Sequence, residues 1–147
     1  MTRPPSVSST VEQAAALPFR DSDRRLEICL ITTRTSGRWS IPKGFIDPGD
    51  TAAGTARKEA GVHGRVVGSP VGYYEITKRG VRYTVAVYLL HVDRVDAQWD
   101  EQDLRTRRWG TADEAMRLPK GRPVEAVFRR GLTQITARAV HREGSTP

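Results

Sequence analysis

The loop that begins at Lys43 contains residue types that suit phosphate chemistry. A Pro-Gly turn at 48–49 precedes Asp50 and Thr51, either of which can cap the N-terminus of a helix. The N–H groups of a helix start, beside a lysine, favour an anion and phosphate in particular. Glu59, near the end of the predicted helix, adds a carboxylate that could bind a metal ion or act as a general base.

A strand, a glycine-bounded loop and one short helix must position these groups. Residues 39–41 predict the strand, and Pro42 comes directly after it. Gly44 and Gly49 permit positive φ angles in the loop. Gly61 is placed to end the helix in left-handed geometry, so the predicted helix has less than three turns.

These residues carry a resemblance to a known family. Ser40-Ile-Pro-Lys-Gly-Phe-Ile-Asp-Pro-Gly-Asp-Thr51, together with Arg57-Lys-Glu-Ala-Gly-Val62, resembles the signature of the Nudix hydrolases. More narrowly, it resembles the branch that includes the diphosphoinositol polyphosphate phosphohydrolases. The resemblance covers roughly residues 11–132, with 14–19 similar to the first family strand and 99–109 similar to a segment common in this branch.

The resemblance implies a fold and an activity. The fold is α/β (α+β), a Nudix-type α/β/α sandwich with a mixed central sheet. The activity is metal-dependent cleavage of a diphosphate linkage in a phosphorylated small molecule. A diphosphoinositol polyphosphate, a dinucleoside polyphosphate and another nucleoside diphosphate derivative are examples among which the sequence does not choose.

The signature is four residues short. The family pattern spans 23 positions, and Gly44 to Val62 covers only 19. Deleting four residues removes about 1.1 turns and rotates the residues beyond the gap by only about 40°, so the helix can still bury its apolar side. Family members use glutamates at i, i+3 and i+4 to bind divalent cations, whereas Glu59 is the one carboxylate on this helix. Depending on where the gap lies, Lys58 stands for the signature arginine or replaces a glutamate, and Asp50 matches the first acid.

The resemblance assigns residue roles position by position. Glu59 is expected to be catalytic, as metal ligand or general base, with an exposed carboxylate paired to a basic neighbour as the alternative. The expected metal ligands are the Gly44 carbonyl, Glu59 and Glu101, and the ion is Mg²⁺, or Mn²⁺. Glu101 and Asp103 lie in an acidic loop where relatives often keep another acid near the metals; otherwise each is a surface charge.

Cationic residues flank the loop. The resemblance implies that Arg34, Arg38 and Lys43 bind substrate phosphates, and a guanidinium can do so through two hydrogen bonds. The alternative for the two arginines is a solvent-facing connector. Gly49, Asp50 and Gly61 are assigned structural roles in the motif, and the three histidines are assigned no function.

The net charge of +7 and the pI near 10.2 suit a polyanionic partner. Arginines are spread along the chain without interleaved aromatics, so nucleic acid is not the favoured partner. The favoured partner is a phosphorylated small molecule. The competing hypothesis from another class is a catalytically weak or inactive Nudix-fold module that binds a phosphorylated ligand. Oligomeric state is left open.

The 147 residues suit a single domain. We expect a flexible tail at 1–10, a Nudix-like domain at 11–140 and a flexible tail at 141–147. The chain has no apolar run of about 18 residues that could cross a membrane. One cysteine, Cys29, suits a reducing compartment and predicts the cytoplasm.

Periodicity predicts the remaining elements. The turn at 79–80 predicts a hairpin, with Tyr83, Val85, Val87 and Leu89 on the core face. The predicted strands are 11–19, 26–33, 62–67, 71–78, 81–92 and 104–109, with a break at 68–70, and the predicted later helices are 111–116 and 123–139.

Overall fold

Alternating apolar residues form the long strands of this chain. The computed structural model describes residues 10–22, 25–34, 36–46 and 49–144. Its strands are β1 Thr10–Ser22, β2 Arg25–Thr32, β3 Trp39–Ser40, β4 Lys43–Phe45, β5 Val62–Lys78, β6 Val81–Val95 and β7 Arg107–Gly110. Its helices are α1 Ala52–Ala60, α2 Ala112–Arg117 and α3 Glu125–Gly144.

The strands form one mixed sheet. Its main path runs β3-β2-β1-β6-β5, with β4 paired to β1 and β7 paired to β2. Only the β1–β6 pairing is parallel among those the structure describes. β1 is therefore the central strand, and β4, which begins the signature loop, pairs with it through Ala14 and Gly44.

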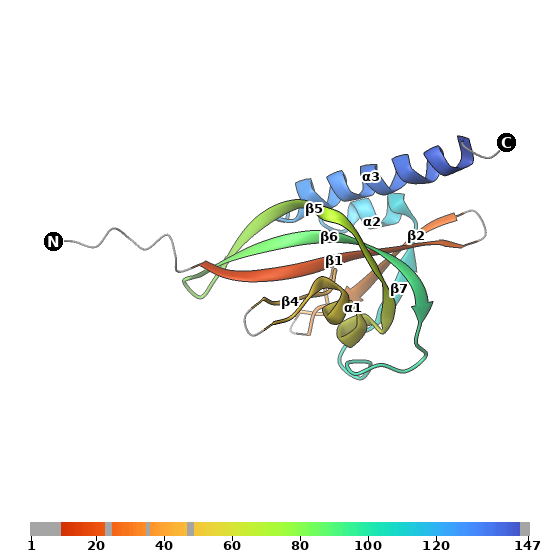
Figure 1. Cartoon of the computed structure of the whole chain (residues 1–147). Helices are drawn as coiled ribbons and strands as arrows, with labels where there is room; N and C mark the ends of the chain where they lie inside the picture. The colour runs from red at the N-terminus through yellow and green to blue at the C-terminus, as the bar shows by residue number, and fades with distance from the viewer. Residues whose placement is uncertain (1–9, 23–24, 35, 47–48, 145–147) are drawn as a thin grey trace.

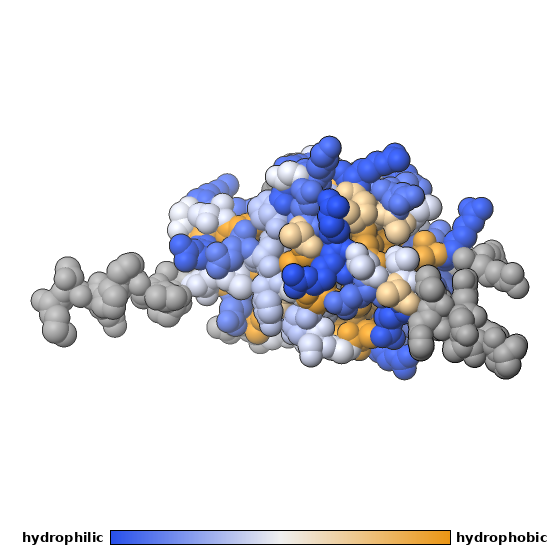
Figure 2. All heavy atoms as spheres, turned by 90° about the horizontal axis from the view of Figure 1, so that it is seen from above, coloured by the Kyte–Doolittle hydropathy of each residue, from blue (hydrophilic) through white to orange (hydrophobic). Residues whose placement is uncertain are grey.

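Helices cover both faces of the sheet (Figure 1), which confirms the predicted three-layer α/β/α sandwich. The residues of β1 alternate between the two sides: Ala15 and Leu17 belong to the core under α2 and α3, and Ala14 and Ala16 to the core under α1. Figure 2 views the face that carries α3, where hydrophilic side chains cover most of the surface.

The hairpin between β5 and β6 is as predicted. Arg79 and Gly80 have φ angles of 51° and 78°, the paired positive values of a tight hairpin turn. Val85, Val87 and Leu89 are buried, as expected for the core face, whereas Tyr83, predicted with them, is half-buried. The opposite face is also covered at Leu90, because α1 packs there.

Several predicted boundaries change. The break expected at 68–70 is a β-bulge: β5 continues through it, with a register shift between Val67 and Gly72 and a φ of +70° at Gly68. β7 starts at Arg107, not 104, because the preceding residues form turns back to Glu101. α3 continues to Gly144 and includes residues 141–144, where the sequence suggested a tail. Residues 1–9 and 145–147 of the predicted tails lie outside the described residues.

Candidate active site

The signature loop brings β4 against the start of α1. Asp50 closes the loop: its carboxylate accepts the Phe45 N–H at 3.1 Å, and its own N–H donates to the Phe45 carbonyl at 2.8 Å. Thr51 is the N-cap of α1 and accepts the Gly54 N–H at 2.9 Å. Gly44 leaves no room for a side chain, because a Cβ there would lie 2.4 Å from Thr55 Oγ1.

The C-terminus of α1 is held by the segment 96–107. Helix ends leave carbonyls without intrahelical partners. Here the Glu101 N–H donates to the Lys58 carbonyl at 3.2 Å, and Trp99 Nε1 donates to the Glu59 carbonyl at 3.0 Å. Arg107 donates to the Ala60 carbonyl at 2.8 Å and lies over the Trp99 ring at 4.2 Å. This segment therefore fixes the short helix that carries Glu59.

Gly61, the left-handed residue that ends α1, contributes to the packing of the segment 96–107 against this helix end. Gly61 has a φ of 66°, as predicted for a helix-ending glycine, and its N–H donates to the Arg57 carbonyl at 3.0 Å. A Cβ at this position would lie 2.7 Å from Trp99 Cβ. Gly61 thus allows the segment 96–107 to approach the helix end closely.

Two of the predicted acids meet on one arginine. Arg105 Nε donates to Glu101 Oε1 at 2.7 Å, and Arg105 Nη2 lies 3.3 Å from Glu59 Oε2. The side chains of Arg105 and Glu101 are 11% exposed, and that of Glu59 is 13% exposed. The other Glu59 oxygen accepts the Lys43 backbone N–H at 3.3 Å. Glu59 and Glu101, both predicted as metal ligands, are therefore held on the same guanidinium.

Burial dominates the electrostatics of Glu59. Loss of solvent raises the pKa of its carboxyl group to about 7. The guanidinium of Arg105 and the Lys43 N–H oppose this increase, and the neighbouring Glu101 carboxylate adds to it. Near neutral pH, Glu59 can therefore accept or release a proton.

The described residues do not fit a metal centre held by the protein. No group of three or more His, Cys, Asp or Glu side chains that could bind a metal occurs in the described ranges. Of the predicted ligands, Glu59 and Glu101 come together, but on the Arg105 guanidinium. The third predicted ligand, the backbone of Gly44, pairs with Ala14 in the antiparallel ladder of β4 and β1.

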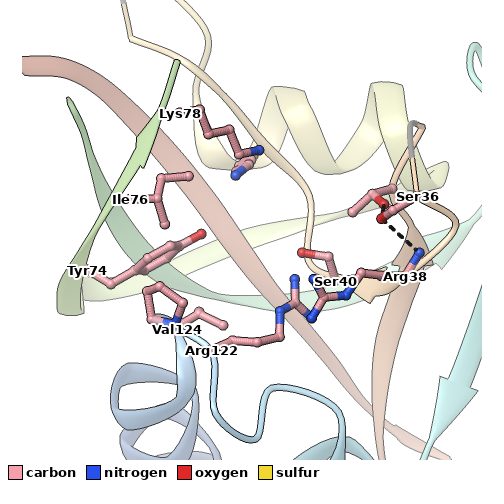
Figure 3. A pocket seen from close by; sticks show the side chains of 11 residues that line it. Ser36, Arg38, Ser40, Tyr74, Ile76, Lys78, Arg122 and Val124 are labelled. Carbon is pink, nitrogen blue, oxygen red and sulfur yellow. Dashed lines mark hydrogen bonds between the residues drawn. The ribbon is translucent and has the colours of Figure 1, made fainter. Parts of the chain in front are cut away.

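A cationic cavity of about 230 Å³ opens next to Lys43. Its charged lining residues, among those described, are all basic: Arg38, Lys43, Lys78 and Arg122. Hydroxyl groups also line it, from Thr33, Ser36, Ser40 and Tyr74. In Figure 3 the Arg38 and Arg122 side chains lie close together, and Tyr74 and Lys78 of β5 approach from the other side. Arg122 is anchored by donating to the Trp39 carbonyl at 2.7 Å.

Burial shifts several pKa values in this cavity, and neighbouring cations modify the shifts. Burial, with repulsion from Lys78, lowers the pKa of Lys43 to about 8, and the Glu59 carboxylate partly opposes this decrease. Burial and the nearby Arg38 lower the pKa of Arg122. Burial raises the pKa of Tyr74 to about 12. A bound anion would relieve the repulsion among these side chains.

The other predicted residues divide between the cavity and positions outside it. Arg38 and Lys43 line the cavity, but Arg34 is exposed and does not appear among its described lining residues. Asp103 is exposed. Gly49 has a φ of 141°, which agrees with a structural role.

Sequence reasoning did not identify four residues of the site. All four lie outside the signature in sequence: Arg105 reaches it from the segment 96–107, Tyr74 and Lys78 from β5, and Arg122 from the turn before α3. The spacing of Glu101 and Arg105, four residues apart, was the available signal for their ion pair.

Comparison with known proteins establishes the class. Residues 10–131 match the NUDIX domain family, so the chain belongs to this family. It is 30% identical over 125 residues to the human diphosphoinositol polyphosphate phosphohydrolase 3-alpha, a match that covers 80% of this chain and 74% of that protein. The family and the names of such relatives identify the chain as a hydrolase.

Solved structures support the fold. A Caenorhabditis elegans Ap4A hydrolase in a binary complex superposes with a TM-score of 0.73 at 16% identity, over 87% of this chain and 99% of that one. The NUDIX domain of Shewanella oneidensis NrtR complexed with ADP-ribose gives 0.68 at 13% identity, over 91% and 94%. Nudix hydrolases generally use divalent metal ions such as Mg²⁺. No helix in the described part of the chain is long and apolar enough to span a membrane.

Proposed function

We propose that this protein hydrolyses a diphosphate linkage in a phosphorylated small molecule, and that its turnover is slow because the family's glutamate cluster is depleted. The observation that carries the proposal is the cavity lined by Arg38, Lys43, Lys78 and Arg122, placed beside Glu59 in a Nudix domain. A diphosphoinositol polyphosphate, a dinucleoside polyphosphate and a nucleoside diphosphate derivative are candidate substrates, since relatives and neighbours are named for such compounds.

The size of the cavity supports binding of the phosphate end of the substrate. Sites that bury a drug-sized ligand usually occupy about 300–1,000 Å³, whereas this cavity occupies about 230 Å³. It therefore suits a diphosphate group, with the rest of the substrate outside. Four cations line this cavity, and a diphosphate would neutralise them, because each can pair with a phosphate oxygen.

The chain supplies charge neutralisation and a proton acceptor. Lys43 and the two arginines stabilise the negative charge that develops on the transferred phosphoryl group. Glu59 accepts the proton of the attacking water, and its orientation is set by the Lys43 N–H and by Arg105. Any divalent ion arrives bound to the phosphates of the substrate. The free thiol of Cys29, which is buried, suits a reducing compartment, and we propose the cytoplasm.

Phosphate release from a panel of diphosphates, with and without Mg²⁺, tests the proposal. Wild type is compared with Glu59→Gln, which keeps the shape of the side chain and removes the proton acceptor. Glu75→Gln, an exposed glutamate on β5, is the control for loss of one negative charge. We expect turnover of at least one diphosphate, a decrease of about 10²-fold or more in Glu59→Gln, and no change in Glu75→Gln.

Two results would contradict the proposal. Equal rates in wild type and Glu59→Gln would remove Glu59 from the reaction. Stabilisation by a diphosphate without turnover of any member of the panel would instead favour a module that binds phosphorylated ligands and cleaves nothing. The same panel therefore distinguishes the two hypotheses.

A further inference from the structure

Arg105 makes more contacts than an ordinary ion-paired arginine. Its Nε and Nη2 face Glu101 and Glu59, and its Nη1 donates to the Thr32 carbonyl at 3.0 Å. All three guanidinium nitrogens therefore have partners. Other described arginine–glutamate pairs, such as Arg129 with Glu125, each join one arginine to one carboxylate at a more exposed position.

The backbone around Arg105 keeps the guanidinium in place. Thr32 ends β2, and besides its carbonyl it offers Oγ1, which accepts the Thr106 N–H at 2.9 Å. The Thr32 N–H donates to the Thr106 carbonyl at 3.1 Å. The residues on both sides of the contact are thus bonded to each other, which fixes the backbone of Arg105 relative to the end of β2.

The Arg105 guanidinium takes the position of a cation between the carboxylates of Glu59 and Glu101. Two carboxylates that are 11% and 13% exposed would repel each other strongly without a cation between them. Arg105 supplies one buried positive charge, which donates a hydrogen bond to Glu101 Oε1 and forms an ion pair with Glu59 Oε2. The other nearby cation, Lys58, lies 4.0 Å from Glu101 Oε2, and its side chain is 57% exposed. A divalent ion seeks the same oxygens, and it would have to approach a buried positive charge to reach them.

We propose that Arg105 is a resident cation that replaces a divalent metal ion at the Glu59–Glu101 pair, so that the folded protein alone has no Mg²⁺ or Mn²⁺ site there. Removing the guanidinium should expose both carboxylates and create such a site. This inference goes beyond the proposed function, because it concerns metal binding by the protein without substrate and does not depend on turnover.

Titration with Mn²⁺, monitored by the loss of the free-ion electron paramagnetic resonance signal, tests the inference. The proteins are wild type, Arg105→Gln and the double variant Arg105→Gln/Glu101→Gln. Arg57→Gln is the control, because Arg57 is exposed on α1 and its removal changes the net charge equally. We expect no saturable binding to wild type or to Arg57→Gln. Arg105→Gln should bind one Mn²⁺ saturably, about tenfold or more tightly than the detection limit of the wild-type titration, and the double variant should lose that site.

Wild type provides a test even where Arg105→Gln does not fold. Saturable binding of Mn²⁺ to wild type that is abolished by Glu59→Gln or Glu101→Gln would overturn the inference. Arg105→Lys gives a further test, since it keeps a positive charge and should remain unable to bind Mn²⁺. Equal Mn²⁺ affinity in folded wild type and Arg105→Gln would also overturn it, whether or not a diphosphate is hydrolysed.

Discussion

Replacing Arg107 by glutamine should destabilise the protein, because Arg107 joins the end of α1 to the segment 96–107. Its Nη1 donates to the carbonyls of Ala60 and Asp96 at 2.8 and 2.9 Å, and its guanidinium lies over the Trp99 ring. A hydrogen bond from a charged donor contributes about 1.5–3 kcal/mol, and a cation–π contact contributes about 0.5–1 kcal/mol. Allowing for partial replacement by water, we expect the free energy of unfolding to fall by about 3 kcal/mol.

The adjacent residue provides the control. Arg108 is 52% exposed and pairs with the exposed Glu114, so Arg108→Gln should change the free energy of unfolding by less than about 1 kcal/mol. Urea denaturation monitored by tryptophan fluorescence measures both variants. Hydrogen exchange at the Gly61 amide should accelerate only in Arg107→Gln. Equal stability of the two variants would refute the conclusion that Arg107 holds the helix that carries Glu59.

Three further predictions concern the cavity, the helix cap and the buried thiol. Lys78→Gln should weaken binding of tripolyphosphate about fivefold or more at low salt, with Lys120→Gln unchanged; calorimetry measures both, and equal affinities would contradict the placement of the anion. Thr51→Val should cost about 1 kcal/mol in urea denaturation, because the Gly54 N–H loses its acceptor; no loss would disprove the cap. Burial raises the pKa of Cys29 from 9.0 to about 12. Its thiol should therefore resist maleimide in the folded state at pH 8. The contribution of this thiol to stability should be complete below pH 9 and fall between pH 9 and 12, because the unfolded chain loses this proton first; rapid labelling of the folded protein would contradict the burial.

Local signals in the sequence predicted much of the fold. The predicted helix at 111–116 is α2, and Thr111 caps it by accepting the Glu114 N–H at 3.1 Å. The hairpin turn at Arg79 and the helix end at Gly61 were likewise visible, because the residue types that such geometries require are few. The predicted strand break at Gly68 was wrong, because a glycine with positive φ can either end a strand or form a bulge. Pairing with the partner strand β6 decides between the two.

The charge arrangement of the site was less predictable. The sequence indicated that Glu59 and Glu101 were the acids to consider, but it did not show which cation they would meet. Arg105 reaches Glu59 only because residues 96–107 fold back over the end of α1. Lys78 and Arg122 reach the cavity from β5 and from the turn before α3. Such contacts depend on tertiary packing. The chain has many arginines, and its sequence does not distinguish those that reach the site from those that do not.

A crystal structure of the wild-type protein grown with Mn²⁺ and methylenediphosphonate, which cannot be hydrolysed, tests the account most directly. It should show the diphosphonate among Arg38, Lys43, Lys78 and Arg122, with any anomalous Mn²⁺ signal on the phosphonate oxygens. The Arg105 guanidinium should remain between the two glutamates. An Mn²⁺ ion bound by Glu59 and Glu101, with Arg105 displaced, would contradict the account.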